Sequence, residues 1–95
     1  MSSQKQRRAK WEREYHASRE EVRTRSAGRC EMPDCISLAT SCHHKLMGRT
    51  HPRGNEPEFL MNVCDLHHAL IHGHPEISYE HGWLLHDWDV PRDAA

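Results

Sequence analysis

Apolar side chains recur at helical spacing near the start of the chain. Three of them fall on one helical face, at intervals of four and seven residues: Trp11, Tyr15 and Val22. Ser18 and Glu21 have the spacing of a capping box, and Gly28 suits the position just after a helix end. The pattern predicts an N-terminal helix that is broken near Ser18 into two pieces and ends at Gly28.

Two β-compatible segments flank a loop in the middle of the chain. Residues 36–43 are free of turn signals, whereas residues 45–57 contain glycines, prolines and an asparagine that no regular element tolerates. Residues 59–63 can form a second strand. Asp65 then suits the N-cap of a helix over residues 66–73. The pattern predicts strand, loop, strand and helix in that order.

Shorter features lie on either side of this unit. Cys30 and Cys35, with Pro33 between them, indicate a tight knuckle before the first strand. After the helix, Pro75 and Gly82 bracket one further short helix, which is followed by a short apolar strand or packing segment, residues 83–85. The predicted fold class is therefore α+β.

Composition indicates that the core needs a cross-link. The chain has 95 residues, of which 36% are hydrophobic, so a single domain would bury little apolar surface. Ten histidines and four cysteines favour a structural metal. The polar start and the lack of a long apolar run predict a cytoplasmic protein with no signal peptide and no membrane contact. In a reducing cytosol, metal ligation is favoured over disulfides, which remain the alternative.

Charge is distributed unevenly although the formal net charge is only -1. Residues 1–29 carry nine Lys and Arg against four Glu, and the remainder carries four against ten acidic residues. A basic segment beside an acidic, histidine-rich body suits contact with a polyanion through the segment and metal binding in the body. A solvated charged helix would show the same pattern.

Two groups of candidate metal ligands follow from spacing. Histidines four residues apart on a helix face one side, so His68 and His72 form half of a metal site. A second group has the paired spacing of structural zinc sites that join distant segments: Cys30, Cys35, Cys64 and His67. Neighbouring helical residues project about a hundred degrees apart, so His67 and His68 are expected to serve different metals.

These residues resemble the HNH endonuclease family, in particular its small phage-encoded members. The resemblance covers about residues 28–86 and rests on His43-His44, the loop, the short strand, the His68 and His72 pair, the interleaved zinc knuckle and the closing Gly82-Trp83-Leu84-Leu85. It implies a small ββα-metal domain with a zinc knuckle. We expect a basic N-terminal arm and helix over residues 1–27, the nuclease domain over 28–86, and a C-terminal tail over 87–95.

The resemblance also implies roles for single residues. It makes His43 a ligand of a catalytic divalent ion together with His68 and His72, and it makes His44 the general base. The ion could be Mg²⁺, Mn²⁺, Ni²⁺ or Zn²⁺, because imidazole ligands accept all four to different degrees. Cations in the loop beside the base are expected to contact DNA phosphates: Lys45, Arg49 and Arg53.

The chain departs from the family at the middle asparagine. The family has an asparagine nine residues before the first histidine of the helical pair, where this chain has Phe59. Asn62 is our choice for its replacement, with Asn55 as the alternative. His67 also stands where a cysteine is usual, and the spacing of Cys30 and Cys35 is longer than usual; zinc tolerates the imidazole.

Three functions are compared on these grounds. The first is a metal-dependent DNA endonuclease with a histidine general base, working in the host cytoplasm if it is phage-encoded, with terminase or other packaging proteins as partners implied by the resemblance. The second is a non-catalytic zinc-binding nucleic-acid or protein adaptor derived from such a domain, which Phe59 supports. The third, a metal-buffering protein, would not need ordered ligand pairs.

Overall fold

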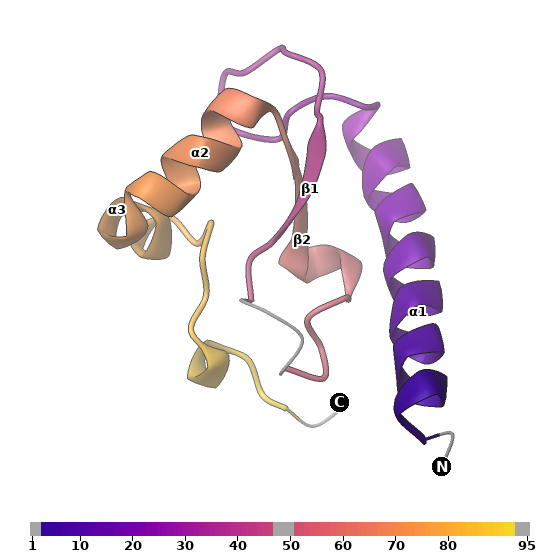
Figure 1. Cartoon of the computed structure of the whole chain (residues 1–95). Helices are drawn as coiled ribbons and strands as arrows, with labels where there is room; N and C mark the ends of the chain where they lie inside the picture. The colour runs from indigo at the N-terminus through magenta and orange to yellow at the C-terminus, as the bar shows by residue number, and fades with distance from the viewer. Residues whose placement is uncertain (1–2, 47–50, 93–95) are drawn as a thin grey trace.

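The fold is a long helix, a two-stranded hairpin and two shorter helices (Figure 1). The computed structural model describes residues 3–46 and 51–92. Its elements in chain order are α1 (Ser3–Ser26), β1 (Ser41–His44), β2 (Leu60–Val63), α2 (Asp65–Gly73) and α3 (Pro75–Glu80), with 3-10 turns at Pro57–Phe59 and Asp87–Asp89. The α+β class expected from the sequence is confirmed, and so is the order of strand, loop, strand and helix.

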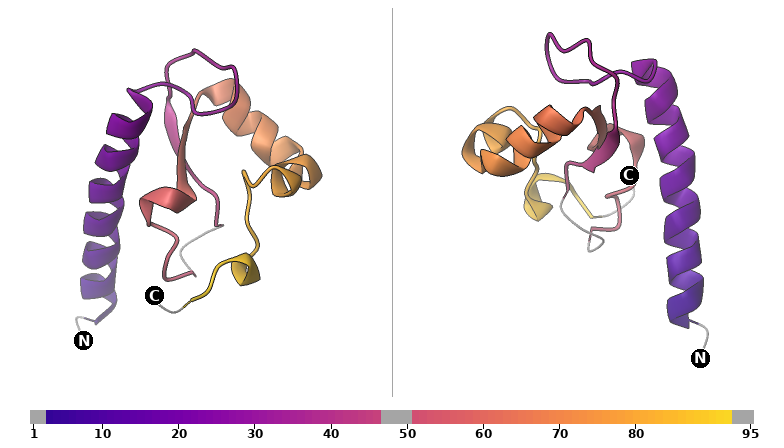
Figure 2. Two further views of the ribbon diagram at one scale, coloured as in Figure 1. Left: turned by 180° about the vertical axis from the view of Figure 1, so that it is seen from behind. Right: turned by 45° about the horizontal axis from the view of Figure 1, so that its top comes forward.

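The hairpin is antiparallel and lies between α1 and α2 (Figures 1 and 2). In its register Cys42 pairs with Asn62 and His43 pairs with Met61. Because side chains alternate along a strand, these two pairs face opposite sides of the hairpin. His43 and Met61 face α2, whereas Cys42 and Asn62 face α1. The register therefore decides which histidine meets which helix.

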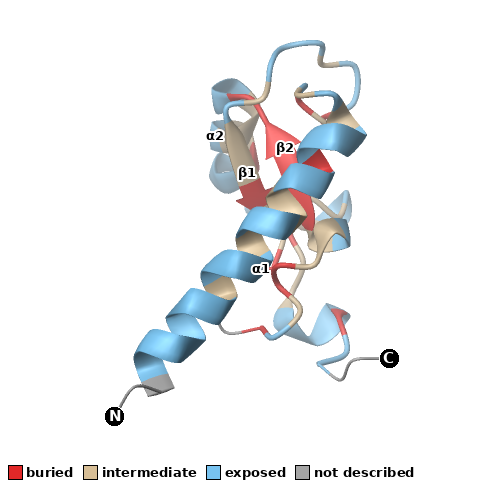
Figure 3. Ribbon diagram, turned by 90° about the vertical axis from the view of Figure 1, so that its right-hand side faces the viewer, coloured by how far each residue is buried: buried red, intermediate tan, exposed pale blue. Residues whose placement is uncertain are grey.

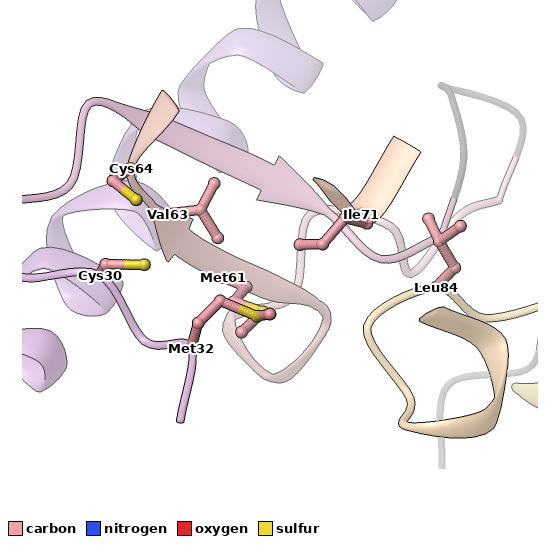
Figure 4. Packing of buried hydrophobic residues seen from close by; sticks show 7 residues of the cluster. All are labelled: Cys30, Met32, Met61, Val63, Cys64, Ile71 and Leu84. Atoms are coloured by element: carbon pink, nitrogen blue, oxygen red, sulfur yellow. The ribbon is translucent and has the colours of Figure 1, made fainter. Parts of the chain in front are cut away.

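The main core cluster lies on the α2 side of the hairpin (Figure 4), while Val22 and Leu60 are fully buried on the α1 side. The main cluster consists of these buried residues: Cys30, Met32, Met61, Val63, Cys64, Ile71 and Leu84. Ile71 is fully buried and comes from α2, while Leu84 comes from the segment after α3. Two of the seven members are cysteines that also belong to a possible metal site. The apolar core and that site therefore occupy one continuous region.

Helix α1 is continuous, so the predicted break at Ser18 is wrong. A capping box satisfies backbone groups only at a helix start, and here the preceding turns already supply those partners. The helix ends where Ala27 and Gly28 adopt positive φ angles of 54° and 75°. The Gly28 N–H donates to the Arg23 carbonyl at 3.1 Å. Figure 3 shows that the outer face of α1 is exposed and that its N-terminal part projects beyond the hairpin.

An ion pair fixes the C-terminal end of α1 to the hairpin. The Arg25 guanidinium contacts both carboxylate oxygens of Glu31, at 2.7 and 2.6 Å. It also donates to the carbonyls of Pro57 and Leu60 at 2.9 Å each. Glu31 in turn accepts from the Asn62 backbone N–H at 2.9 Å. This bidentate contact holds α1 against β2 at the level of the knuckle.

Two predicted boundaries shift for local reasons. The first strand begins at Ser41 and not at residue 36, because the knuckle uses the backbone before it: the Cys30 N–H donates to the Ser37 carbonyl at 2.8 Å. Asp65 is the first residue of α2 and Cys64 is its N-cap. The Asp65 carboxylate instead accepts from the Thr40 hydroxyl at 2.6 Å. None of the helices in the described ranges is long and apolar enough to cross a membrane.

Candidate metal centres

Three segments bring the Cys and His ligands of the knuckle together. Cys30 follows the turn after α1, and Cys64 stands at the junction of β2 and α2. His67 lies three residues after Cys64 in the first turn of α2, so both face the same side. With Cys35 they form a group whose candidate ligand atoms all lie within 4.8 Å of one another. The structure thus contains a possible Cys₃His metal site.

The spacing in this group fits a tetrahedral ion. The His67 Nδ1 atom lies 3.6 Å from Cys30 Sγ and 3.3 Å from Cys64 Sγ. Zinc–sulfur and zinc–nitrogen bond lengths give a tetrahedral sulfur-to-nitrogen edge of about 3.6 Å. Both measured separations are therefore close to those that one zinc would impose, and the donor set of three thiols and one imidazole is one that zinc prefers.

Hydrogen bonding and burial shift the pKa values of two knuckle thiols in opposite directions. A backbone N–H of Ser37 lowers the pKa of Cys35 to about 7, so this thiol is partly ionised at neutral pH. Burial raises the pKa of Cys30, so its thiolate needs a cation to be stable. Thiolate is the form that ligates metals, and a bound cation would supply the missing stabilisation for Cys30.

A second group consists of three imidazoles. His43 comes from β1, and His68 and His72 lie one turn apart on α2; their candidate ligand nitrogens all fall within 4.8 Å. The Nε2 atoms of His68 and His72 are 3.3 Å apart. A tetrahedral zinc would separate two ligand nitrogens by about 3.3 to 3.4 Å. The three rings meet edge to face, with centroids 4.9 to 5.4 Å apart.

One side of this imidazole group is closed and the other is open. His43 is buried with 2% of its surface exposed, whereas His72 is exposed. The His43 Nε2 atom lies 2.7 Å from the Trp83 carbonyl, which can only accept, so Nε2 carries the proton and Nδ1 is free to bind a metal. Three protein ligands with an open side are typical of a metal site that keeps a position for water or substrate.

Burial favours the neutral form of two of these imidazoles, those of His43 and His68. It lowers the pKa of His43 to about 4, and the neighbouring His72 and His68 lower it further, against the effect of the Trp83 carbonyl. Burial and His72 also lower the pKa of His68. A histidine must be neutral to ligate a metal. At pH 7 no proton therefore competes for His43.

His44 lies on the opposite face of the hairpin, against α1. Its ring stacks on Tyr15 with centroids 5.2 Å apart and on Trp11 at 6.0 Å. Its Nε2 atom is 2.8 Å from Asn55 Oδ1, and Asn55 Nδ2 donates to the Trp11 carbonyl at 3.3 Å. The Trp11 carbonyl fixes the orientation of the Asn55 amide, so its oxygen must face His44. His44 therefore donates from Nε2 and has its lone pair on Nδ1.

Asn55, and not our choice Asn62, contacts His44. The register pairs Asn62 with Cys42, two residues before His44, so Asn62 does not lie directly opposite that ring. Its amide donates instead to the Ser26 hydroxyl at 2.8 Å, which ties β2 to α1. Asn55 reaches His44 because residues 51–56 pass beside the end of β1. Both asparagines are buried, and only Asn55 is placed to orient the imidazole.

The loop cations differ in what they contact. Arg53 contacts Glu56 at 2.9 Å and Glu58 at 3.4 Å, and its guanidinium lies over the Phe59 ring. These contacts hold the loop, and the contact of Arg53 with DNA phosphates stays a prediction. Lys45 is half-buried, and burial lowers its pKa. Arg49 lies outside the described residues.

Some site contacts were missed by sequence reasoning. The sequence gives no signal that Trp11 and Tyr15 meet His44. The contact depends on how α1 lies against the hairpin. The sequence also gives no signal that the Trp83 carbonyl contacts His43, because every residue has a backbone carbonyl.

Comparison of the chain with protein-family models, curated proteins and solved structures gave no match.

Proposed function

We propose that this chain is a metal-dependent DNA endonuclease of the HNH type, which hydrolyses phosphodiester bonds with one divalent ion and a histidine general base. One observation supports it above all: three imidazoles converge within 4.8 Å, and the residue after His43 in β1 is a further histidine, His44, whose ring is held by an amide. A hairpin followed by a helix that carries the histidine pair is the arrangement expected of a ββα-metal domain. The basic α1 beside it suits a polyanionic substrate.

In this mechanism His44 accepts the proton of the attacking water. Asn55 holds the imidazole with Nε2 protonated, so Nδ1 is the atom that takes the proton. The rings of Trp11 and Tyr15 restrict rotation of the imidazole about its side-chain bonds. A base held in one orientation needs less reorganisation in the transition state.

His43, His68 and His72 would hold the divalent ion on the α2 side. When bound, that ion would act as a Lewis acid on a phosphodiester oxygen and neutralise the charge that develops there. The chain itself contributes neutral ligands, since burial keeps His43 unprotonated. The exposed edge at His72 leaves an approach for the phosphate.

A second candidate, a zinc-binding adaptor without catalytic activity, is favoured by a different observation. The stacked rings of Trp11 and Tyr15 cover part of the His44 imidazole. A general base must be open to the attacking water, so this cover favours a role without catalysis. His44 nevertheless remains partly exposed. Cleavage assays separate the two candidates.

The deciding experiment compares His44→Ala with His68→Ala on supercoiled plasmid across Mg²⁺, Mn²⁺, Ni²⁺ and Zn²⁺. His44→Ala should bind the metal as the wild type does and should cleave about a hundred- to ten-thousand-fold more slowly, the usual loss for a general base. His68→Ala should lose the labile metal in a calorimetric titration. The matched control is His74→Ala, since His74 is exposed and makes no side-chain capping bond. Equal cleavage by wild type and His44→Ala would rule out this mechanism.

A further inference from the structure

A polar pocket of about 230 Å³ lies between the C-terminal half of α1 and the start of β1. It is separate from both metal groups and is lined by Arg19, Arg23, Gly28, Ala39, Thr40, Ser41 and Asn62. Two of the lining residues are arginines one turn apart on α1, and none is acidic. The pocket therefore presents positive charge from one wall to whatever enters it.

The two arginines are available to a ligand. Arg19 is half-buried and lies close enough to Cys42 to offset in part the rise that burial causes in the pKa of that thiol. Within the described residues no carboxylate forms an ion pair with Arg19. Arg23 contacts Glu20 at 3.6 Å, an exposed pair on one helix that an anion could displace at little cost.

The opposite wall supplies neutral polar groups. The Thr40 hydroxyl donates to Asp65, and the Ser41 side chain shares the α2-facing side of β1 with His43, so neither hydroxyl is free to donate to the pocket. The Asn62 amide uses one N–H on Ser26 and has a second one left. Gly28 has no side chain and Ala39 has only a methyl group, so neither residue fills the pocket. Two guanidinium groups and a free amide N–H favour a tetrahedral oxyanion such as phosphate.

The pocket lies along α1 from His44, the proposed general base. Tyr15, which stacks on His44, lies four residues before Arg19 and eight before Arg23 on the same helix. These intervals correspond to about 6 and 12 Å along the α1 axis. Because a nucleic-acid strand carries one phosphate per about 3.4 Å of duplex axis, a strand that passes His44 presents another phosphate at this distance within a few nucleotides.

We propose that this pocket binds a backbone phosphate of the DNA strand a few nucleotides from the bond that is cut, with Arg19 and Arg23 as its anchors and Asn62 as a donor. The inference rests on the proposed function for the identity of the ligand, DNA. It adds a subsite that fixes the register of the strand along α1, and it leaves the chemistry at His44 and the metal unchanged.

The first test titrates inorganic phosphate into the zinc-loaded protein and detects binding by amide NMR. Saturable shifts are expected at Gly28, Ala39 and Ser41, and they should vanish in the double variant Arg19→Ala/Arg23→Ala. The control Lys5→Ala/Arg13→Ala removes the same charge from exposed positions of α1 outside the pocket and should keep the shifts. Absent shifts, or equal shifts in the two double variants, would overturn the proposal.

The second test measures duplex DNA binding in the His44→Ala background at several salt concentrations. Loss of two phosphate contacts should reduce the slope of log K against log salt by about 1.8 for Arg19→Ala/Arg23→Ala. An unchanged slope would overturn the DNA subsite. If the wild type binds phosphate and DNA as expected but cleaves no plasmid, the subsite stands and the proposed nuclease activity fails, so the two failures are distinguishable.

Discussion

His43 and His44 are neighbours in sequence, yet their imidazoles lie on opposite faces of the hairpin because side chains alternate along a strand. His67 and His68 diverge for another reason, the rotation of about a hundred degrees per residue in a helix. The members of each adjacent pair thereby face different parts of the molecule. A one-residue shift in the register of β1 would exchange the faces on which His43 and His44 lie.

At the residue scale, Asn55 is predicted to matter for rate and Asn62 for stability. Asn55→Ala should slow plasmid cleavage by about tenfold or more, because His44 would lose the partner that fixes its orientation and protonated nitrogen. Asn62→Ala should keep the cleavage rate at saturating DNA, because it leaves His44 and its partner in place, and it should lower the melting temperature, because it removes the bond to Ser26. Cleavage and thermal unfolding of both variants check this; the reverse pattern would reassign the two residues.

The depressed pKa of His43 predicts a pH effect on stability. Its folded pKa is about 4 against an ordinary value of 6.5, so the unfolded chain binds the proton first as pH falls. The contribution of neutral His43 to the free energy of unfolding is therefore fully present above about pH 6.5, and it is lost progressively as the pH falls toward 4. From pH 7 to 5.5 the wild type should lose about 1 kcal/mol more than His43→Gln, which removes the titrating group and can still donate to the Trp83 carbonyl. Equal losses in denaturant unfolding would contradict this.

At the element scale, the knuckle joins the end of α1, the end of β2 and the start of α2. Its ligands Cys30 and Cys64 are also members of the apolar core. A metal bound there would add folding free energy, which a small core supplies only in part. The helices and the hairpin are therefore expected to fold as one unit around this site.

This makes the knuckle a test of folding. Purified protein should carry about one tightly bound zinc, and Cys30→Ser or Cys64→Ser should abolish the cooperative thermal transition. Cys42→Ser is the matched control, since Cys42 is half-buried in β1 and outside both ligand groups. Elemental analysis and calorimetry measure the two quantities. A zinc-free protein that melts cooperatively would show that the core suffices.

The elements and the ligand groups were predictable because they depend on local spacing. The pairs Cys64 with His67 and His68 with His72 are set by the helical repeat, and the structure brings them together as expected. Residue spacing could not predict the partner of His44. Asn55 reaches His44 only because of the path of its loop, and the glycines and prolines of that loop specify no single conformation. The continuity of α1 at Ser18 likewise depends on packing against the hairpin.

At the scale of the whole molecule, α1 gives the protein an elongated shape of 46 × 27 × 25 Å. The helix is about 36 Å long, so much of its basic surface extends beyond the hairpin (Figure 3). The acidic residues lie mostly in the remainder of the chain. A duplex would thus be attracted along α1, and on that side it meets the His44 ring and the Arg19 pocket before the core.

The two metal groups should differ in how readily they release an ion. The knuckle offers three thiols, two of them buried, whereas the imidazole group offers neutral ligands and is exposed at His72. Thiolates neutralise the charge of a divalent ion and imidazoles do not, and the open side lets water and chelator approach. Brief treatment with a carboxylate chelator should therefore abolish cleavage while the far-UV spectrum and the melting transition persist. Adding back Mg²⁺ or Mn²⁺ should restore cleavage without refolding. If activity and fold were lost together at every chelator concentration, one metal would be serving both purposes, and the separation of the sites proposed for His67 and His68 would be incorrect.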